Sequence, residues 1–427
     1  MSQTIGGLII SFLAVICAFQ PWVTVAVILV LGLVGPFVPA LEDLRGLSVI
    51  AIMGMLGSTR YIFQGGLRGW PLLWPVAFGA VFFVNVVISP YGDWNFAQLL
   101  AGAFCTYYLA CYAIRSRRQA SIIAYTAILV GVFAGAVSFA DLRLGLHYFN
   151  PIDPIYAGRV HGMERSLAGN PNYLFPFVLP GLFFALLLYF TRASKLTKAL
   201  MLGALGVMVV GSLATLSRGT AVAVGVIFLV LLLSRSERSI VRWGLTVLPF
   251  LVVGIVLYHA FPEMFGLLIE RFQEVEEEGT GARGYLFEVG LQQFSQSPLW
   301  GVGIGTTIAT AHHAVHDGYF GLLGETGIIG LVLFYSMPFV WVLQVEWARR
   351  QAERLRAARI PGRVFDLLRA FLIGCLVYSL FNTIVYLKPV LLLMAVTQLY
   401  LTAFQGRRTP SAQAMVALVN EARPRAP

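Results

Sequence analysis

The chain has 427 residues, of which 58% are hydrophobic and only 12% charged, and its mean hydropathy is +0.79. This composition excludes an ordinary set of soluble domains and indicates a polytopic membrane protein. The net charge of +10 does not indicate nucleic-acid binding, because the basic residues fall in short loops between apolar segments. A transmembrane helix needs about 20 mostly apolar residues, so we expect roughly a dozen spans.

The apolar segments, taken in chain order, predict an all-α membrane bundle of about twelve transmembrane helices with a large loop before the tenth. The expected spans lie at about 5–38, 46–63, 71–89, 95–114, 121–140, 173–190, 196–214, 218–234, 240–260, 319–345, 364–385 and 387–404. Because Pro21 lies in the middle of the first segment, that segment is either one kinked helix or a short hairpin. Residues 285–296, which precede Pro298, predict an additional interfacial helix.

The basic loops set the expected orientation of the bundle. They alternate with the spans, at 60–68, 115–118, 192–198, 235–242, 349–369 and in the tail from Arg407. We therefore expect these loops and both termini in the cytoplasm, and the long loops 141–172 and 261–318 on the outer face. The membrane domain then comprises residues 1–405, and the segment 406–427, rich in Pro, Ala and Arg, is expected to be a disordered cytoplasmic tail.

The residues able to carry chemistry lie on the outer face. Neighbouring His312 and His313 cannot point the same way on a regular element, so one catalytic histidine, His316, is favoured over a three-histidine metal site. The four cysteines lack ligand-like or disulfide-like spacing. Guanidinium groups suit forked contacts with phosphate, so arginines on this net-negative side predict a cationic pocket. These arginines are Arg159, Arg165, Arg218, Arg271 and Arg283.

Some of these features also have simpler interpretations. An arginine in an outer turn, such as Arg218, can contact lipid headgroups. Glu325 could orient His316, pair with an arginine, or merely charge a helix start. Tyr319 could be an interfacial aromatic residue. The glycine-rich run 301–305 lacks the spacing of a phosphate-binding loop and predicts a tight turn.

Five motifs follow one another between residues 165 and 340. They are Asn170-Pro171-Asn172 after Arg165, Leu216-Ser217-Arg218-Gly219, Gly281-Ala282-Arg283, the run Ser297 to Gly305, and the run His316 to Leu331. In this order they resemble the O-antigen ligase and polymerase superfamily. Asp317 departs from the family pattern, which usually has asparagine after the histidine.

The resemblance implies a periplasmic glycosyltransferase of the bacterial inner membrane. Such an enzyme moves a glycan from an undecaprenyl diphosphate carrier to an acceptor hydroxyl, with no nucleotide sugar, cofactor or metal. By resemblance His316 is the base, which suits an imidazole pKa of about 6.5, and Arg218 and Arg283 stabilise the leaving diphosphate. The residues expected to bind substrate are Arg159, Arg165, Arg271, Asn172, Tyr319 and Glu325.

The favoured activity is O-antigen ligase, with lipid A-core as the acceptor and the phospholipid bilayer as the surrounding medium. A polymerase that extends the same lipid-linked repeat, or an oligosaccharyltransferase acting on protein hydroxyls, would use similar donor chemistry. A small-solute transporter is the alternative of another class. It predicts ionisable residues near mid-membrane, whereas the charges here cluster at the ends of the spans.

Overall fold

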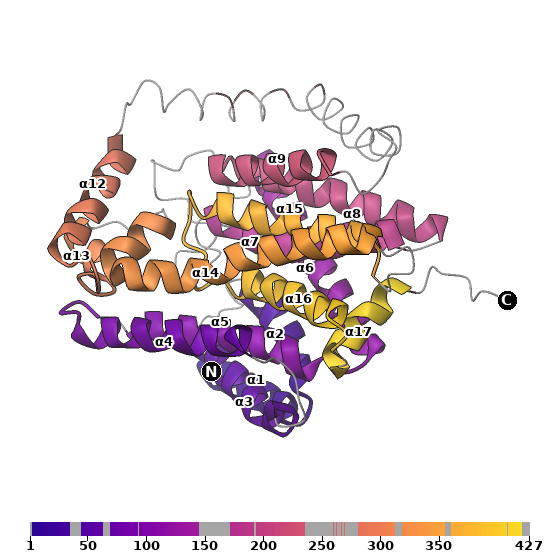
Figure 1. Cartoon of the computed structure of the whole chain (residues 1–427), viewed down its shortest axis with the longest axis horizontal. Helices are drawn as coiled ribbons and strands as arrows, with labels where there is room; N and C mark the ends of the chain where they lie inside the picture. Colours follow the sequence, from indigo (N-terminus) through magenta and orange to yellow (C-terminus); the bar gives the residue numbers. More distant parts are fainter. Residues whose placement is uncertain are drawn as a thin grey trace.

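The computed structural model describes residues 2–34, 44–62, 69–92, 94–144, 171–191, 194–234, 281–311, 318–354, 360–407 and 409–420, together with residues 259, 262, 266 and 269. Within this part of the chain the regular elements are all α-helices, arranged as a bundle (Figure 1), which confirms the predicted polytopic helical fold. The helices are α1 (Ser2–Phe19), α2 (Pro21–Val34), α3 (Leu44–Ile62), α4 (Trp70–Ile88), α5 (Trp94–Ala113), α6 (Arg117–Leu144), α7 (Pro171–Thr191), α8 (Lys195–Ala214), α9 (Arg218–Leu232), α12 (Gly281–Gln296), α13 (Thr306–Ala311), α14 (Gly318–Arg354), α15 (Gly362–Tyr378), α16 (Lys388–Phe404) and α17 (Pro410–Val419).

The predicted spans coincide with helices, except for 240–260, of which only residue 259 is described. Six of the described helices are long and apolar enough to cross a membrane. The predicted interfacial helix is present as α12. The span predicted at 364–385 is too long, because α15 ends at Tyr378 and an irregular connection, the α15–α16 turn (Ser379–Leu387), precedes α16.

The first apolar segment is a hairpin of two helices that bends at Pro21. The carbonyl of Phe19, at the end of α1, accepts a hydrogen bond from Arg60 near the end of α3, at 3.2 Å. From there α2 runs back along α3, since a Cβ on Gly54 would lie against Thr24. The start of α1 therefore lies away from Arg60. Of the two forms predicted for this segment, the structure shows the hairpin, and the side of the membrane on which the N-terminus lies stays a prediction.

Aromatic side chains fill the core where α4, α5 and α14 meet. Trp74 is fully buried, with ring centroids of Phe104, Tyr107, Phe334 and Trp341 at 5.5 to 5.9 Å from its own. Its indole N–H donates to a main-chain carbonyl of α14 at 2.8 Å, so this polar group is satisfied inside the core. The packing fixes α14 against α4 and α5.

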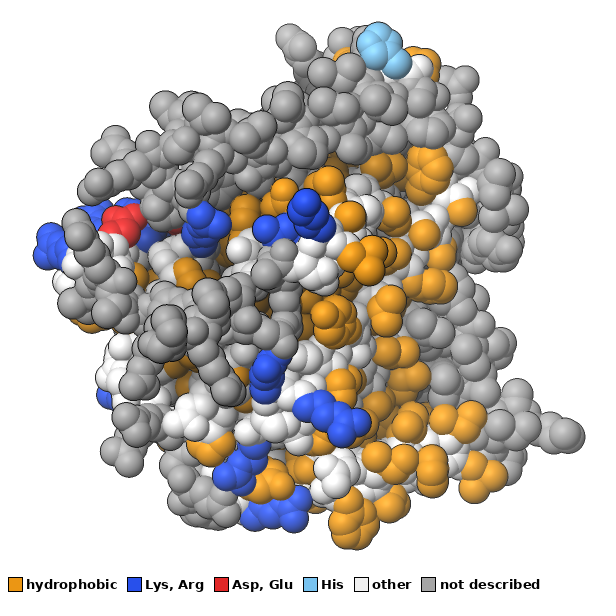
Figure 2. Space-filling model, turned by 90° about the vertical axis from the view of Figure 1, so that its right-hand side faces the viewer, with side chains coloured by type: hydrophobic (Ala, Val, Ile, Leu, Met, Phe, Trp, Pro, Cys, Tyr) orange, Lys and Arg blue, Asp and Glu red, His pale blue; other side chains and the backbone are white. Residues whose placement is uncertain are grey.

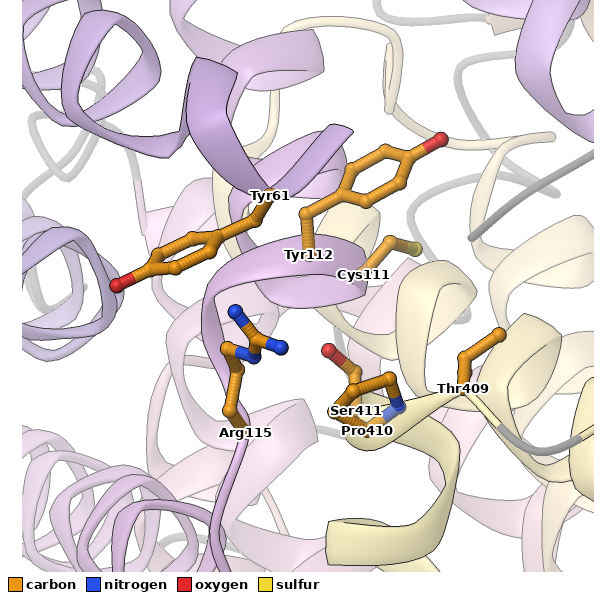
Figure 3. Close-up of a pocket in the computed structure, with 7 residues that line it drawn as sticks. All are labelled: Tyr61, Cys111, Tyr112, Arg115, Thr409, Pro410 and Ser411. Atoms are coloured by element: carbon orange, nitrogen blue, oxygen red, sulfur yellow. The ribbon is translucent and has the colours of Figure 1, made fainter. Parts of the chain in front are cut away.

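Basic side chains gather at one end of the bundle, called here the basic end. Arg60 and Arg115 lie over the ring of Tyr61, with their guanidinium carbons 4.7 and 4.5 Å from its centroid. Arg115 also lines a small pocket with Thr409 and Ser411, so this pocket joins the ends of α3, α5 and α17 (Figure 3). Figure 2, which views the molecule from the right-hand side of Figure 1, shows Lys and Arg side chains over the left and centre of this face, with few Asp or Glu among them.

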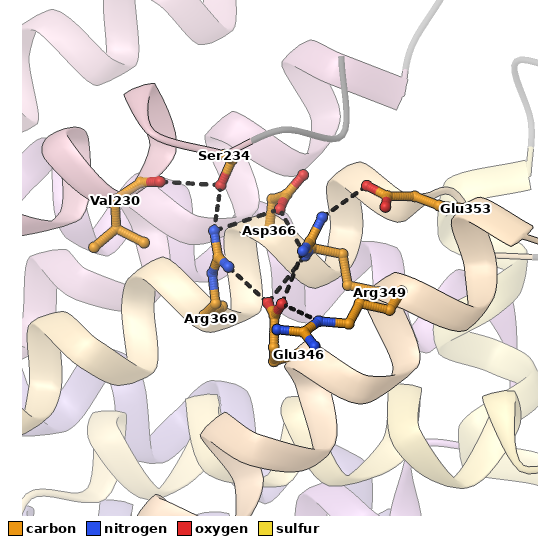
Figure 4. Close-up of polar contacts among 8 residues, drawn as sticks. Val230, Ser234, Glu346, Arg349, Glu353, Asp366 and Arg369 are labelled. Carbon is orange, nitrogen blue, oxygen red and sulfur yellow. Dashed lines mark hydrogen bonds and ion pairs between the residues drawn. The ribbon is translucent and has the colours of Figure 1, made fainter. Parts of the chain in front are cut away.

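An ion-pair cluster ties α9, α14 and α15 together at the basic end (Figure 4). Glu346 of α14 pairs with Arg349 at 2.8 Å and with Arg369 of α15 at 2.6 Å. Arg369 also donates to the hydroxyl of Ser234, just after α9, at 2.7 Å. Asp366, which is 1% exposed, lies 3.8 Å from both arginines. The cluster fixes where three helices stand relative to one another, and hence where their opposite ends lie.

Part of the segment expected to be a disordered tail is a buried helix. The residues Pro410–Val419 form α17, and the Thr409 hydroxyl caps its start by accepting the N–H of Ala412 at 3.2 Å. Met415 and Leu418 are buried in the core. The high content of Pro, Ala and Arg hid this apolar stripe, which is only three turns long and therefore a weak signal of a helix.

Candidate functional site

The structure describes part of the predicted site. Arg218, Tyr319 and Glu325 are described with their side chains, whereas for Arg283 and Asn172 only a position in the first turn of α12 and α7 is described. The predicted residues outside the described part are His316, Arg159, Arg165 and Arg271. The site is therefore built from the elements that flank these positions. They lie on the side of the bundle opposite the basic end, toward α12 and α13 (Figure 1). This end is called here the outer end, after its predicted orientation.

A tight turn between α8 and α9 presents Arg218. Leu216 has a φ of 50°, a left-handed conformation that costs a residue other than glycine about 1–2 kcal/mol. The hydroxyl of Ser217 then caps α9 by accepting the N–H of Thr220 at 3.4 Å. Arg218 is the first residue of α9 and is half-buried. Strained residues of this kind cluster at functional sites, which supports a role for this turn beyond packing.

The first turn of α14, directly after the histidine motif, is fixed by close contacts. The N–H of Gly318 donates to the carbonyl of Ser379 at 2.8 Å. A Cβ at Gly318 would lie 2.5 Å from the Ser379 hydroxyl and 2.7 Å from that of Tyr335, so the position requires glycine. Tyr319 stacks on Tyr335 with ring centroids 4.2 Å apart, and its hydroxyl donates to a carbonyl of α15 at 3.1 Å. Tyr319 is thus anchored inside the bundle.

The α15–α16 turn connects these two parts of the site. On one side, Ser379 accepts the N–H of Gly318. On the other side, Phe381 packs on Gly219, where an added Cβ would lie 2.5 Å from the Cβ of Phe381. Arg218 and the start of α14 therefore flank the same turn. The structure brings together two motifs that lie far apart in the sequence.

The glycine-rich run is a tight turn, as predicted. Gly301, Gly303 and Gly305 have φ values of 76°, 101° and 86°, which favour glycine because a side chain would clash. The N–H groups of Val302 and Gly303 donate at 3.0 Å to carbonyls of α14, next to a kink at Gly327. Because these N–H groups already bond within the protein, the run does not form a phosphate cradle.

The carboxylate of Glu325 caps the short helix α13. One of its oxygens accepts the N–H of Gly305 at 3.1 Å and the N–H of Thr307 at 3.4 Å. A helix start offers unpaired N–H groups and a partial positive charge, both of which favour a carboxylate. Among the three roles predicted for Glu325, these contacts match that of a charged residue at the start of a helix. The helix whose start it caps is α13, whereas Glu325 itself belongs to α14.

Hydropathy alone did not predict that the α15–α16 turn borders the site. The hydropathy pattern assigns the residues of this turn to the apolar segments on either side of it. Asn382 and Lys388 were the available signals. Both are polar residues within apolar sequence, and in the structure they are 0% and 4% exposed.

Within the described part of the chain, no group of three or more His, Cys, Asp or Glu side chains could hold a metal ion. Because His312, His313 and His316 lie outside that part, the expected metal independence stays a prediction.

Residues 203–335 match the family model described as O-antigen ligase. The matched segment contains Arg218, Arg283, His316, Tyr319 and Glu325. No curated protein shows significant similarity to the chain. The resemblance seen in the motifs is therefore confirmed for this segment.

Proposed function

We propose, from the membership of residues 203–335 in the O-antigen ligase family, that this multi-pass membrane protein is a glycosyltransferase that uses a lipid-linked donor. The proposed activity is O-antigen ligase, which transfers polysaccharide from undecaprenyl diphosphate to a lipid A-core sugar on the periplasmic face of the inner membrane. His316 is the proposed base, and Arg218 and Arg283 are the proposed diphosphate ligands. Neither a metal nor a cofactor takes part in this scheme.

The reaction needs a base and a stabilised leaving group. The acceptor oxygen bonds to the anomeric carbon of the donor, and its proton passes to His316. The bond from that carbon to the diphosphate oxygen breaks, and the electron pair leaves on the oxygen. Imidazole is a suitable base near neutral pH, and guanidinium groups offset the charge that grows on the leaving diphosphate.

The observation that carries this proposal is the meeting of two family motifs on one turn. Arg218 begins α9, and α14 begins directly after His316 and Asp317. The α15–α16 turn contacts both helix starts. An arginine suited to diphosphate and the chain that follows the proposed base therefore border one region at the outer end.

The depth of this region suits a donor held in the membrane. The helix α9 has 15 residues and is therefore about 22 Å long, which is shorter than the hydrocarbon thickness of about 30 Å. Its other end is tied to the basic end through Ser234 and Arg369. We therefore expect Arg218 to lie below the outer surface of the bilayer, where a carrier with its isoprenoid chain in the lipid can present its diphosphate.

Transfer and donor binding by purified variants test the assigned roles. His316→Ala should lower transfer by about 10²- to 10⁴-fold while donor binding persists, because only proton transfer is lost. Arg218→Ala and Arg283→Ala should lose transfer and bind the donor weakly. Arg283→Lys should recover little, because lysine lacks the planar fork.

His313→Ala is the matched control and should remain active. Near-normal transfer by His316→Ala, or loss of transfer in His313→Ala alone, would assign the base to another histidine.

Glycan-linkage analysis of a deletion strain tests the acceptor class. Lipid-linked polymer that remains unattached to lipid A-core supports the ligase. An accumulation of single repeats would indicate a polymerase, and loss of glycan from protein would indicate a protein oligosaccharyltransferase.

A further inference from the structure

Two buried polar side chains of the α15–α16 region have no role in the scheme above. The ammonium of Lys388, at the first position of α16, has no hydrogen-bond partner among the described residues. The same holds for both amide atoms of Asn382. Both side chains are more than nine-tenths buried. Buried polar groups are nearly always paired, so these two call for a partner that the described chain does not supply.

The energetic cost of Lys388 is higher than that of a neutral group. A charge inside a membrane bundle is expensive and normally pairs with a group of opposite charge. The start of α16 also carries the partial positive charge of a helix N-terminus, and this charge repels the ammonium of Lys388. Among the described residues no carboxylate forms an ion pair with Lys388. An anion is therefore the partner that would stabilise this position.

The place of Asn382 in the fold points to the same site, and Lys388 is linked to it along the chain. Asn382 lies beside Gly219, where an added Cβ would be 3.3 Å from its Nδ2. It therefore borders the helix start that carries Arg218. Lys388 follows at the end of the same turn, the turn that also binds the start of α14 through Ser379.

We propose that Lys388 and Asn382 form a phosphate-binding subsite for the leaving diphosphate of the lipid-linked donor, next to Arg218. The inference rests on the proposed function and extends it to the C-terminal helices. The Lys388 ammonium pairs with a phosphate oxygen, and the Asn382 Nδ2 donates to another. The Asn382 Oδ1 is then available to accept a hydrogen bond from a sugar hydroxyl.

The charge balance of the reaction explains the need for another cation. A diphosphate esterified at both ends carries two negative charges, which the two proposed arginines match. When the bond to the sugar breaks, the electron pair stays on the diphosphate oxygen and a third negative charge forms. Lys388 offsets that third charge, so its contribution is larger in the transition state than in the bound donor.

Lys388→Met tests this role, because methionine keeps much of the shape and removes the charge. With purified full-length protein and lipid-linked glycan, we expect kcat to fall about 10²-fold with a smaller change in the donor KM. Inhibition by undecaprenyl diphosphate should weaken by at least about tenfold. The melting temperature should stay the same or rise, because the variant lacks a buried charge that has no partner among the described residues. Asn382→Leu should raise the donor KM about tenfold.

Lys195→Met, the same change at an exposed lysine of the basic end, is the matched control and should behave like the wild type. Unchanged kcat and product inhibition in Lys388→Met would overturn the proposal. So would a lower melting temperature with activity lost in proportion, since Lys388 would then be a structural residue.

A second measurement separates this proposal from the proposed function. Undecaprenyl diphosphate alone should raise the melting temperature of the wild type and not that of Lys388→Met. That result would support the subsite even if the wild type failed to transfer glycan. An equal rise in both proteins would overturn the subsite even if transfer occurred.

Discussion

The contacts of Glu325 lead to a prediction that separates a structural carboxylate from a catalytic one. Both N–H groups that it accepts, from Gly305 and Thr307, reach the same oxygen, Oε1. Glu325→Gln can therefore keep both hydrogen bonds through the amide oxygen and lose only the charge. Glu325→Ala removes the acceptor and leaves two N–H groups without a partner.

The expected magnitudes follow from this geometry. An unsatisfied buried polar group costs about 1–3 kcal/mol, so Glu325→Ala should lower the free energy of unfolding by about 2–6 kcal/mol. A hydrogen bond to a charged group exceeds a neutral one by about 1 kcal/mol, so Glu325→Gln should cost about 2 kcal/mol or less. Glu325→Gln should retain most of its transfer activity, whereas Glu325→Ala should lose activity because the tight turn of the glycine-rich run 301–305 is no longer held to α14 by that carboxylate.

Thermal unfolding followed with a thiol-reactive dye measures these differences. Three free cysteines, Cys17, Cys111 and Cys375, are buried and become reactive on unfolding. Glu288→Ala removes an exposed carboxylate of α12 and serves as the control. The reasoning fails if Glu325→Ala melts with the wild type. It also fails if Glu325→Gln is inactive at an unchanged melting temperature, because the charge would then take part in the chemistry.

Two further predictions concern topology and metal dependence. Single cysteines at Ser295, on α12, and at Ala157 should react with a membrane-impermeant maleimide in intact spheroplasts, whereas a cysteine at Lys195 should react only after lysis; the reverse pattern would invert the proposed orientation. Purified protein should keep its transfer activity in excess EDTA, because arginines supply the positive charge at the diphosphate; a loss restored by magnesium or manganese would contradict the arginine-based mechanism.

Hydropathy predicted most of the described helices, because a span must be both long and apolar. It could not show where a span breaks. The kink at Gly327 and the end of α15 at Tyr378 lie inside runs that read as continuous. Both breaks depend on residues that are distant in the sequence. The run Ser297 to Gly305 bonds to α14 at the kink near Gly327, and the start of α14 bonds to the turn that follows Tyr378.

For the candidate site, the sequence identified the motifs but not the reason for their glycines. Gly219 and Gly318 look alike as spacers beside a charged or histidine motif. In the structure each is required because the α15–α16 turn approaches too closely for a side chain. Contacts of this kind join residues far apart in the sequence, so spacing within a motif cannot predict them.

The α15–α16 turn itself argues for a binding role at the outer end. Irregular backbone at membrane depth is tolerated only where it is buried in protein or lines a cavity, because unpaired N–H and C=O groups are too costly in lipid. The backbone of the turn meets this condition, since the N–H of Asn382 donates to Tyr378 and that of Leu387 donates to Ile384, both at 3.1 Å. Its side chains differ, because those of Asn382 and Lys388 have no hydrogen-bond partner among the described residues. A turn optimised only for stability would carry apolar residues at both positions, so the polar ones imply a ligand that completes their hydrogen bonds.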